Sequence, residues 1–418
     1  MLQMSFDQKL SMYARLLVDR GMNVQPGQFV LVAFEGGVSE DLALLVMEHA
    51  YRRGARHVDV IYEHPRIKHA RLTLGPADDR FFFPLHTVLG REQIVDSQGC
   101  VLALRTNIEP DLFNEIPQLA GEYDGAYRKQ VLGRFHQEGI NKGQVSWCVA
   151  CPPSPKAAQK AYPELGAEDA FAAYWDAVFH MTMADKEDCI EHWEALDATL
   201  HERCGKLDAL NIRTLNFYGP ETRLTVGLSQ ASRWKGGSEK SASGKTFLPN
   251  IPTFEVFTTP DRRLTEGRVR ITRPVNLDGV LVEGLRLEFK DGKIVAFDAD
   301  TNRDAYDAFI AKDEGARMLG EVALVGTDSP VFQEGRIFNN TLYDENAACH
   351  IATGRGYTTC FENGWNLGKE DLLELGFNQS ATHQDVMISD HDVDVDAITA
   401  DGSEVALLRN GRWVPAFM

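Results

Sequence analysis

Six side chains in the C-terminal half of the sequence are of the kinds that bind divalent metal ions: Glu255, Glu321, Glu345, His350, His383 and Asp385. A catalytic pair of such ions needs several carboxylates and one or two imidazoles, and at least one carboxylate must bridge the two ions. The six residues supply four carboxylates and two imidazoles, so they meet this requirement. The four carboxylates also offset the four positive charges of two divalent ions.

His383 and Asp385 lie in the segment SATHQDVMI, in which polar and apolar residues alternate. Side chains two residues apart in a β-strand point to the same face of the sheet. We therefore expect a strand here, with both side chains available to one metal ion. A His-x-Asp triplet also arises often by chance, so two ordinary polar residues are the alternative interpretation.

The segment NNTLYDENAACHIATGRGY, residues 339–357, places acidic and amide residues before a run of small apolar residues that contains His350. We expect Asp344 to cap a helix that begins at about residue 346. In such a helix His350 and Tyr357 are seven residues apart and share one face, whereas Glu345 projects from the turn before the helix. The alternative is a capped helix whose buried histidine serves only the fold.

Glu255 and Glu321 both occur in apolar surroundings, within PNIPTFEVFTTP and MLGEVALVG. A glutamate inside a buried strand costs free energy unless it is paired or binds a metal ion. A nearby arginine such as Arg317 is the alternative partner for either residue. When these two glutamates are considered together with the two segments above, one shared metal site is the simplest explanation for all of them.

The length of 418 residues favours two domains. An amphipathic helix at 6–20 precedes a continuously apolar strand at 29–35, a further strand is expected at 57–63, and the segments 99–106 and 144–151 read as buried strands. We therefore predict an α/β domain over residues 1–195, with an open, largely parallel sheet and a helical junction at its end. From residue 205 to residue 418 the pattern changes to strands and tight turns, which predicts an antiparallel-rich α+β domain that carries the metal site.

The net charge of −18 argues against a nucleic-acid partner, because phosphate binding needs clustered lysine and arginine side chains. No stretch approaches eighteen uninterrupted apolar residues, so we expect no membrane-spanning helix. The first residues do not have the pattern of a secretory signal peptide, and the seven cysteines are sparse and odd in number. These features favour a cytoplasmic protein with reduced thiols.

Four motifs, in this order along the chain, carry a resemblance to a known family: PNIPTFEVFTTPD, LGEVALV, TLYDENAACHIATGRGY and an Asn-Gln-Ser segment followed by His-x-Asp-x-Met-Ile. Together they resemble the thermophilic-type metallo-aminopeptidases, the group of aminopeptidase T, aminopeptidase S and PepS. The resemblance covers nearly the whole chain. The order and spacing of the four motifs are far more specific to this family than any one motif alone.

The resemblance implies that Glu255, Glu321, Glu345, His350, His383 and Asp385 bind two divalent ions. Zinc, cobalt and manganese all accept such ligands. The resemblance also implies that Glu321 bridges the ions, and so takes part in catalysis, and that Tyr357 is a catalytic phenol. The implied reaction is hydrolysis of the N-terminal residue from short peptides with a free N-terminus by a metal-activated water. The implied assembly is a homodimer.

One departure from the family pattern lies beside the first proposed ligand. Phe254 stands where the family has the first glutamate of a Glu-Glu pair, so any substrate-facing role of that acid is in question. Two other functions use similar ligands and stay open at this point. One is a different dinuclear metal hydrolase that acts on non-peptide amides or phosphoesters, and the other is a non-catalytic metal-binding protein.

Overall fold

The computed structural model describes residues 4–36, 39–106, 108–109, 111–277 and 280–418. The chain forms two compact units. The first comprises Met1–Glu194 and Ser238–Pro252, and the second comprises Ala195–Gly237 and Thr253–Met418. Each unit has its own sheets, and each is described separately below.

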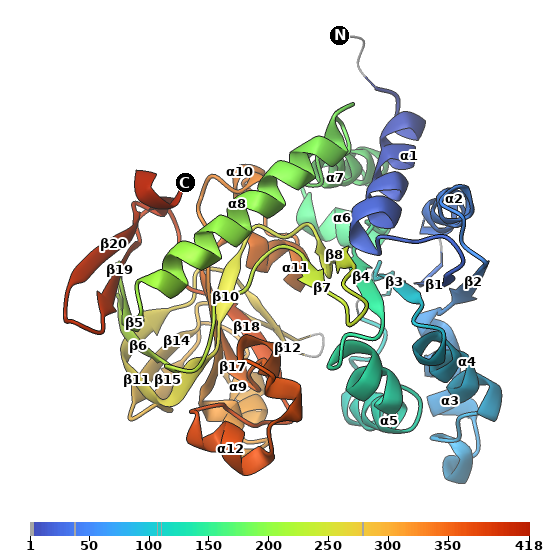
Figure 1. Cartoon of the computed structure of the whole chain (residues 1–418). Coiled ribbons are helices and arrows are strands. Elements are labelled where there is room, and N and C mark those ends of the chain that lie inside the picture. The colour runs from blue at the N-terminus through green and yellow to red at the C-terminus, as the bar shows by residue number, and fades with distance from the viewer. Residues whose placement is uncertain (1–3, 37–38, 107, 110, 278–279) are drawn as a thin grey trace. The chain divides into compact units, whose positions relative to one another are not determined.

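The first unit is built around a five-stranded parallel sheet in the order β2-β1-β3-β4-β9 (Figure 1). Its strands are β1 (Phe29–Phe34), β2 (His57–Tyr62), β3 (Cys100–Leu104), β4 (Ser146–Ala150) and β9 (Asn250–Ile251). The prediction of an open parallel sheet in this part of the chain is confirmed. The central strands are apolar on both faces because packed elements cover both faces of a parallel sheet.

Helices connect these strands. They are α1 (Phe6–Leu16), α2 (Ser39–Arg52), α3 (Pro65–Leu74), α4 (Leu85–Asp96), α5 (Pro117–Gln130), α6 (Pro155–Ala161) and α7 (Ala167–Met181), and α8 (Cys189–Ala209) contains the division between the units. A capping box fixes the start of α1, because the Ser5 hydroxyl accepts from the Gln8 amide and the Gln8 side chain accepts from the Ser5 amide. The segment Ser238–Pro252 adds the short strands β7 (Glu239–Lys240) and β8 (Thr246–Phe247).

The division of the chain differs from the sequence prediction in one segment. The prediction assigned everything from residue 205 onward to the C-terminal domain, whereas Ser238–Pro252 belongs to the first unit. Strand β9 explains this assignment, because Asn250 and Ile251 pair in parallel with Val149 and Ala150 of β4. A strand of two residues has no periodicity from which its partner could be inferred.

The second unit contains an eight-stranded sheet and a four-stranded sheet. The larger sheet has the order β15-β14-β11-β6-β5-β19-β20-β21, with β5 (Ile212–Gly219), β6 (Thr222–Leu228), β11 (Pro260–Arg270), β14 (Arg286–Lys290), β15 (Lys293–Asp298), β19 (Asp394–Thr399), β20 (Glu404–Arg409) and β21 (Arg412–Trp413). Its strand pairs are antiparallel. The prediction of an antiparallel-rich C-terminal part is confirmed.

The four-stranded sheet has the order β10-β16-β17-β18 and is also antiparallel. Its strands are β10 (Val256–Thr258), β16 (Leu319–Leu324), β17 (His350–Gly354) and β18 (His383–Met387). One hydrophobic core contains residues of both sheets, among them Phe217, Val322, Ile351 and Val386. One face of the four-stranded sheet is therefore packed into the hydrophobic core.

The remaining elements of the second unit are short. They are the hairpin β12 (Val275–Leu277) and β13 (Val280–Val282) and the helices α9 (Arg303–Ile310), α10 (Pro330–Gln333), α11 (Thr341–Asp344) and α12 (Lys369–Glu374). Within the described residues, no helix combines the length and the apolar character needed to cross a bilayer.

Candidate metal centre

The four-stranded sheet has one apolar face and one face that carries metal-binding side chains. Val322, Ile351 and Val386 lie opposite one another on β16, β17 and β18 and belong to the hydrophobic core. Side chains alternate between the two faces along each strand, so the neighbouring row of residues points the other way. The core row thus fixes which side chains face the candidate site.

That neighbouring row consists of Glu321 on β16, Ala352 on β17 and Asp385 on β18. Residues directly opposite in antiparallel strands have their Cβ atoms about 4.5–5.5 Å apart and lie on the same face. Ala352 is fully buried, and its single methyl group lets the two carboxylates beside it approach to within 4.8 Å of each other. A larger side chain at this position would extend into the space between them.

Two histidines lie on the same face as this row. His350 is two residues before Ala352 on β17, and His383 is two residues before Asp385 on β18. The expected strand around His383 and Asp385 is therefore confirmed, and so is the common direction of their side chains.

The helix predicted from about residue 346 is wrong. His350 begins strand β17, and the Asp344 carboxylate accepts hydrogen bonds from the Phe338 and Asn340 amides, which precede it in the chain. Asp344 thus stabilises the loop before it and caps no helix after it. Tyr357 lies in the loop that follows β17, three residues after Gly354, and not on a helix with His350. A short apolar run does not distinguish a buried strand from a helix by periodicity.

Two groups of three donor residues occur in the described part of the chain, each with its ligand atoms within 4.8 Å of one another. We name them the first triad (Glu255, Glu321 and His350) and the second triad (Glu321, His383 and Asp385). Glu321 belongs to both. Five of the six predicted ligands therefore come together, and the residue predicted to bridge the ions is the one that the triads share.

The two carboxylate oxygens of Glu321 are divided between the triads. Its Oε1 lies 4.0 Å from His350 Nε2, and its Oε2 lies 3.4 Å from His383 Nε2. His350 Nε2 is also 3.1 Å from Glu255 Oε2, and His383 Nε2 is 3.4 Å from Asp385 Oδ1. Tetrahedral ligands about 2.0 Å from a metal ion lie roughly 3.3 Å from one another. The observed separations are of this size.

Both imidazole rings are held in the orientation that a metal ligand requires. His350 Nδ1 lies 3.2 Å from the Ala348 carbonyl oxygen, and His383 Nδ1 lies 2.7 Å from the Arg355 carbonyl oxygen. A carbonyl oxygen only accepts hydrogen bonds, so each Nδ1 must carry the hydrogen. Nε2 is then the nitrogen that faces the carboxylates and can bind a metal ion.

Glu345 lies outside both triads, but the charges of the triad residues shift the pKa of its carboxyl group. Burial, followed by the charges of Glu255 and Asp385, raises the pKa of Glu345 well above its usual range. Like charges gathered in a poorly solvated place have this effect. Glu345 follows the last residue of α11 and begins a short 3-10 turn, so it does not lie in the turn before a helix, as the sequence predicted.

The carboxylates also act on the two histidines. Burial alone would lower the pKa of His350, but the adjacent Glu255 carboxylate, followed by Glu321, raises it well above the ordinary value. For His383, Asp385 and then Glu321 likewise overcome the effect of burial and raise the pKa. The cluster therefore creates a strongly negative potential that favours bound cations.

One buried oxygen tests directly whether the residues fit a metal ion. Glu255 is 7% exposed, and its Oε2 makes no hydrogen bond of acceptable geometry, although His350 Nε2 lies 3.1 Å away. An unsatisfied buried carboxylate oxygen costs free energy unless a cation compensates it. Together with the shared Glu321 and the two oriented imidazoles, this oxygen makes the donor set fit divalent metal ions.

Tyr357 lies beside the second triad. Its hydroxyl oxygen is 3.2 Å from His383 Nε2, and its ring contacts the rings of His383 and Phe257, with centroids 5.0 and 5.5 Å away. The residue is 40% exposed overall, but its hydroxyl faces the cluster. Loss of solvation and the charges of Glu321 and Asp385 raise the pKa of Tyr357 well above its ordinary value, so it is a neutral hydrogen-bond donor at pH 7.

Asn346 joins the two segments that carry Glu345 and Glu255, and it was not among the residues predicted to serve the site. Its Oδ1 accepts from the Phe254 amide at 2.6 Å, and its Nδ2 donates to the Leu342 carbonyl at 2.8 Å. Phe254 is itself buried at this contact. The only signal in the sequence was an amide side chain within a small apolar run.

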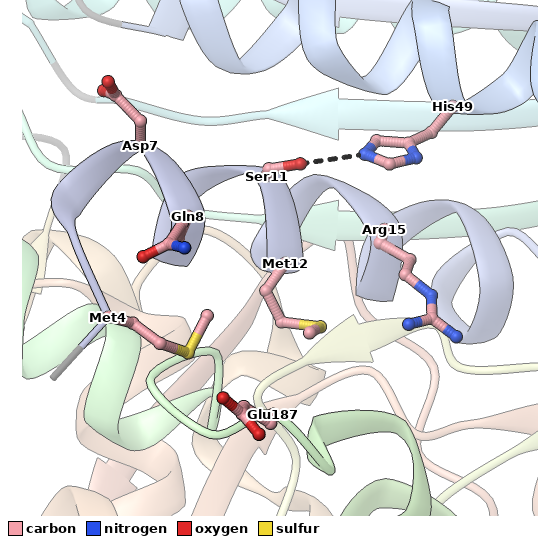
Figure 2. Close-up of a pocket in the computed structure, with 8 residues that line it drawn as sticks. All are labelled: Met4, Asp7, Gln8, Ser11, Met12, Arg15, His49 and Glu187. Carbon is pink, nitrogen blue, oxygen red and sulfur yellow. Dashed lines mark hydrogen bonds between the residues drawn. The ribbon is translucent and has the colours of Figure 1, made fainter. Parts of the chain in front are cut away.

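A separate hollow of about 480 Å³ lies on the first unit, between α1, α2 and Glu187 (Figure 2). Figure 2 shows the hydrogen bond between the Ser11 hydroxyl and His49 Nε2, 3.3 Å apart, which joins two residues that line it. Met12 and Arg15 contribute to its wall, and Arg15 is paired with Asp19. None of the predicted ligands lines this hollow, so it is not the candidate metal centre.

A sequence profile of the thermophilic metalloprotease family, M29, matches residues 6–413. The chain belongs to this family. Membership in M29 makes it a metal-dependent peptidase, which agrees with the donor set assembled on the four-stranded sheet. The M29 match spans both units of the fold.

Individual proteins match over nearly the whole length of the chain. Aminopeptidase AmpS of Bacillus subtilis is 34% identical over 98% of this chain and 99% of its own length. Aminopeptidase T of Thermus thermophilus is 36% identical, again over 98% and 99% of the two chains. The solved structure of wild-type AmpT from Thermus thermophilus superposes with a TM-score of 0.89 at 35% identity, and covers 98% of this chain and 100% of that chain.

Proposed function

We propose that this metal-dependent aminopeptidase holds two divalent ions and removes the N-terminal residue from short peptides that have a free N-terminus. The observation that supports two ions most strongly is the division of the Glu321 oxygens between two triads. A single ion would require only one of these triads. Full-length similarity to proteins named aminopeptidases supports the reaction.

The first triad would hold one ion and the second triad the other, with Glu345 beside them. When bound, the ions supply a lowered pKa for a water molecule and polarisation of the scissile carbonyl. Carboxylate and imidazole ligands admit zinc, cobalt or manganese. The family resemblance is the support for a homodimer.

Other groups of the protein would orient the metal ligands and the substrate carbonyl. The Ala348 and Arg355 carbonyls hold the two imidazoles with Nε2 directed at the site. Tyr357 is a neutral phenol at its edge and would donate a hydrogen bond to the developing oxyanion of the substrate carbonyl. The small Ala352 leaves room for ions and substrate between Glu321 and Asp385.

Chelation followed by addition of single metals tests this function. We expect the chelated protein to lose activity on a free tripeptide, and zinc, cobalt or manganese to restore it. An N-acetylated tripeptide of the same sequence should release its first residue at least about 100-fold more slowly, since it lacks the free amine. Release of amino acids is followed by chromatography.

Nitrophenyl phosphate and a non-peptide amide serve as control substrates in the same metal-restored samples. Equal cleavage of the free and acetylated peptides would contradict the aminopeptidase assignment. Faster turnover of nitrophenyl phosphate would favour a phosphoesterase with the same ligands. Full activity after complete metal removal would exclude a metal-dependent reaction.

A further inference from the structure

A buried amide side chain near the candidate metal centre joins three backbone segments. Asn378 is 2% exposed, and its Nδ2 lies 2.8 Å from the Gly315 carbonyl oxygen, 3.1 Å from that of Met318 and 2.6 Å from that of Gly354. A carbonyl oxygen only accepts, so Asn378 must donate in all three contacts. An amide nitrogen carries two hydrogens, so the three carbonyls share them.

These segments frame the strands that carry the ligands. Met318 immediately precedes β16, which holds Glu321, and Gly354 ends β17, which begins with His350. The Gly354 amide donates to the Met318 carbonyl at 2.9 Å, so Asn378 and Gly354 bind the same oxygen.

The backbone segments that meet around Asn378 are too closely packed to admit a side chain at Gly320 or Gly354. A Cβ atom on Gly320 would lie 2.4 Å from the Gly354 carbonyl oxygen, and one on Gly354 would lie 2.3 Å from the Thr382 oxygen. Gly354 also has a φ of 107°, a backbone conformation that residues other than glycine rarely adopt. The strands and the loop after β17 therefore meet backbone to backbone, and a small shift in one displaces the others.

The loop at residues 354–357 contacts His383 on both sides of its ring. The Arg355 carbonyl accepts from Nδ1 at 2.7 Å, and the Tyr357 hydroxyl lies 3.2 Å from Nε2. Asn378 contacts this loop twice, because its side chain donates to the Gly354 carbonyl and its own carbonyl accepts from the Gly356 amide at 3.0 Å. The position of the loop decides where Nε2 points and where the phenol sits.

We propose that Asn378 is a positioning residue that fixes the loop at 354–357 and thereby orients His383 and Tyr357 for metal binding and catalysis. This inference rests on the proposed two-metal function. The Asn378 side chain donates to backbone carbonyls and not to the candidate metal ligands, so its effect is indirect. Partners that orient metal ligands in this way typically contribute about 10–100-fold to metal affinity or activity.

The test compares Asn378→Ala with wild type in the full-length protein loaded with cobalt(II). Three quantities are measured: kcat and KM on an amino-acid nitroanilide, and the visible absorption of bound cobalt(II), which reports ligand geometry without turnover. We expect kcat to fall about 10–100-fold, KM to stay within about twofold, and the cobalt bands to change in position or intensity.

Thr222→Val is the matched control, because Thr222 is 6% exposed and its hydroxyl accepts from the Arg270 amide within the eight-stranded sheet. This variant should lower the melting temperature but keep wild-type kcat and cobalt bands. The proposal is overturned if Asn378→Ala keeps the wild-type kcat and spectrum, or if Thr222→Val changes both equally. Should Asn378→Ala fail to fold, Asn378→Ser, which keeps one donor, is judged by the same criteria.

The wild-type protein separates this inference from the proposed function. If wild type binds fewer than two cobalt ions or does not cleave the nitroanilide, the two-metal aminopeptidase proposal fails. If wild type behaves as expected and Asn378→Ala is indistinguishable from it, only the positioning role fails.

Discussion

Replacing Glu321 by Gln is expected to lower kcat/KM by about 10³-fold or more. Both carboxylate oxygens of Glu321 face donor groups, one toward His350 and the other toward His383. Glutamine offers one oxygen and directs an NH₂ group, which repels cations, at the other position. Metal ions contribute several kcal/mol to such reactions, and each factor of ten corresponds to about 1.4 kcal/mol.

The measurement pairs steady-state kinetics with metal analysis by mass spectrometry. Glutamine has nearly the same shape as glutamate, so circular dichroism and the melting temperature should show a folded protein. Glu288→Gln, at an exposed position of β14, controls for the chemical change itself and should be wild-type-like. If Glu321→Gln keeps more than a tenth of wild-type kcat/KM and both ions, the shared-ligand role of Glu321 is wrong.

Replacing Tyr357 by Phe is expected to lower kcat by about 10²–10³-fold while KM and metal content stay near wild type. The substitution removes the hydroxyl that lies 3.2 Å from His383 Nε2 and keeps the ring contacts with His383 and Phe257. Loss of one donor to a developing oxyanion typically costs an enzyme this much in kcat. The split between kcat and KM distinguishes this role from substrate binding.

Tyr62→Phe is the control for the Tyr357 variant, because Tyr62 is 52% exposed on the edge strand β2 of the first unit. It should have no effect on the kinetics. If Tyr357→Phe loses metal along with activity, the phenol acts by holding His383 in place. Unchanged kcat in Tyr357→Phe would exclude the phenol from the reaction altogether.

Much of the site followed from the sequence because its ligands obey short-range rules. The i, i+2 spacing of His383 and Asp385 predicts a common face once a strand is assumed, and β18 has that form. Glu321 stood out because a carboxylate within a buried apolar strand requires compensation. Strands β1 and β3 of the first unit were also predictable, since short continuous apolar runs are typical of sheets covered on both faces, whereas the two residues of β9 carry no such signal.

Other parts depended on contacts between residues far apart in the chain. Asp344 has the residue type of a helix cap, but its carboxylate binds amides that precede it. Ile351 and Thr353 are β-branched and buried between β16 and β18, which favours a strand after His350. Asn378 donates to carbonyls 24 to 63 residues away, and no local pattern marks such a residue.

Glu321 is expected to bind two metal ions at once, and anomalous diffraction from crystals of the zinc-loaded protein tests this shared binding most directly. Data on either side of the zinc absorption edge locate each ion independently of any activity. We expect two anomalous peaks per chain, one at Glu255, Glu321 and His350 and the other at Glu321, His383 and Asp385. A single peak, or a pair of peaks that does not share Glu321, would contradict the bridging role of Glu321.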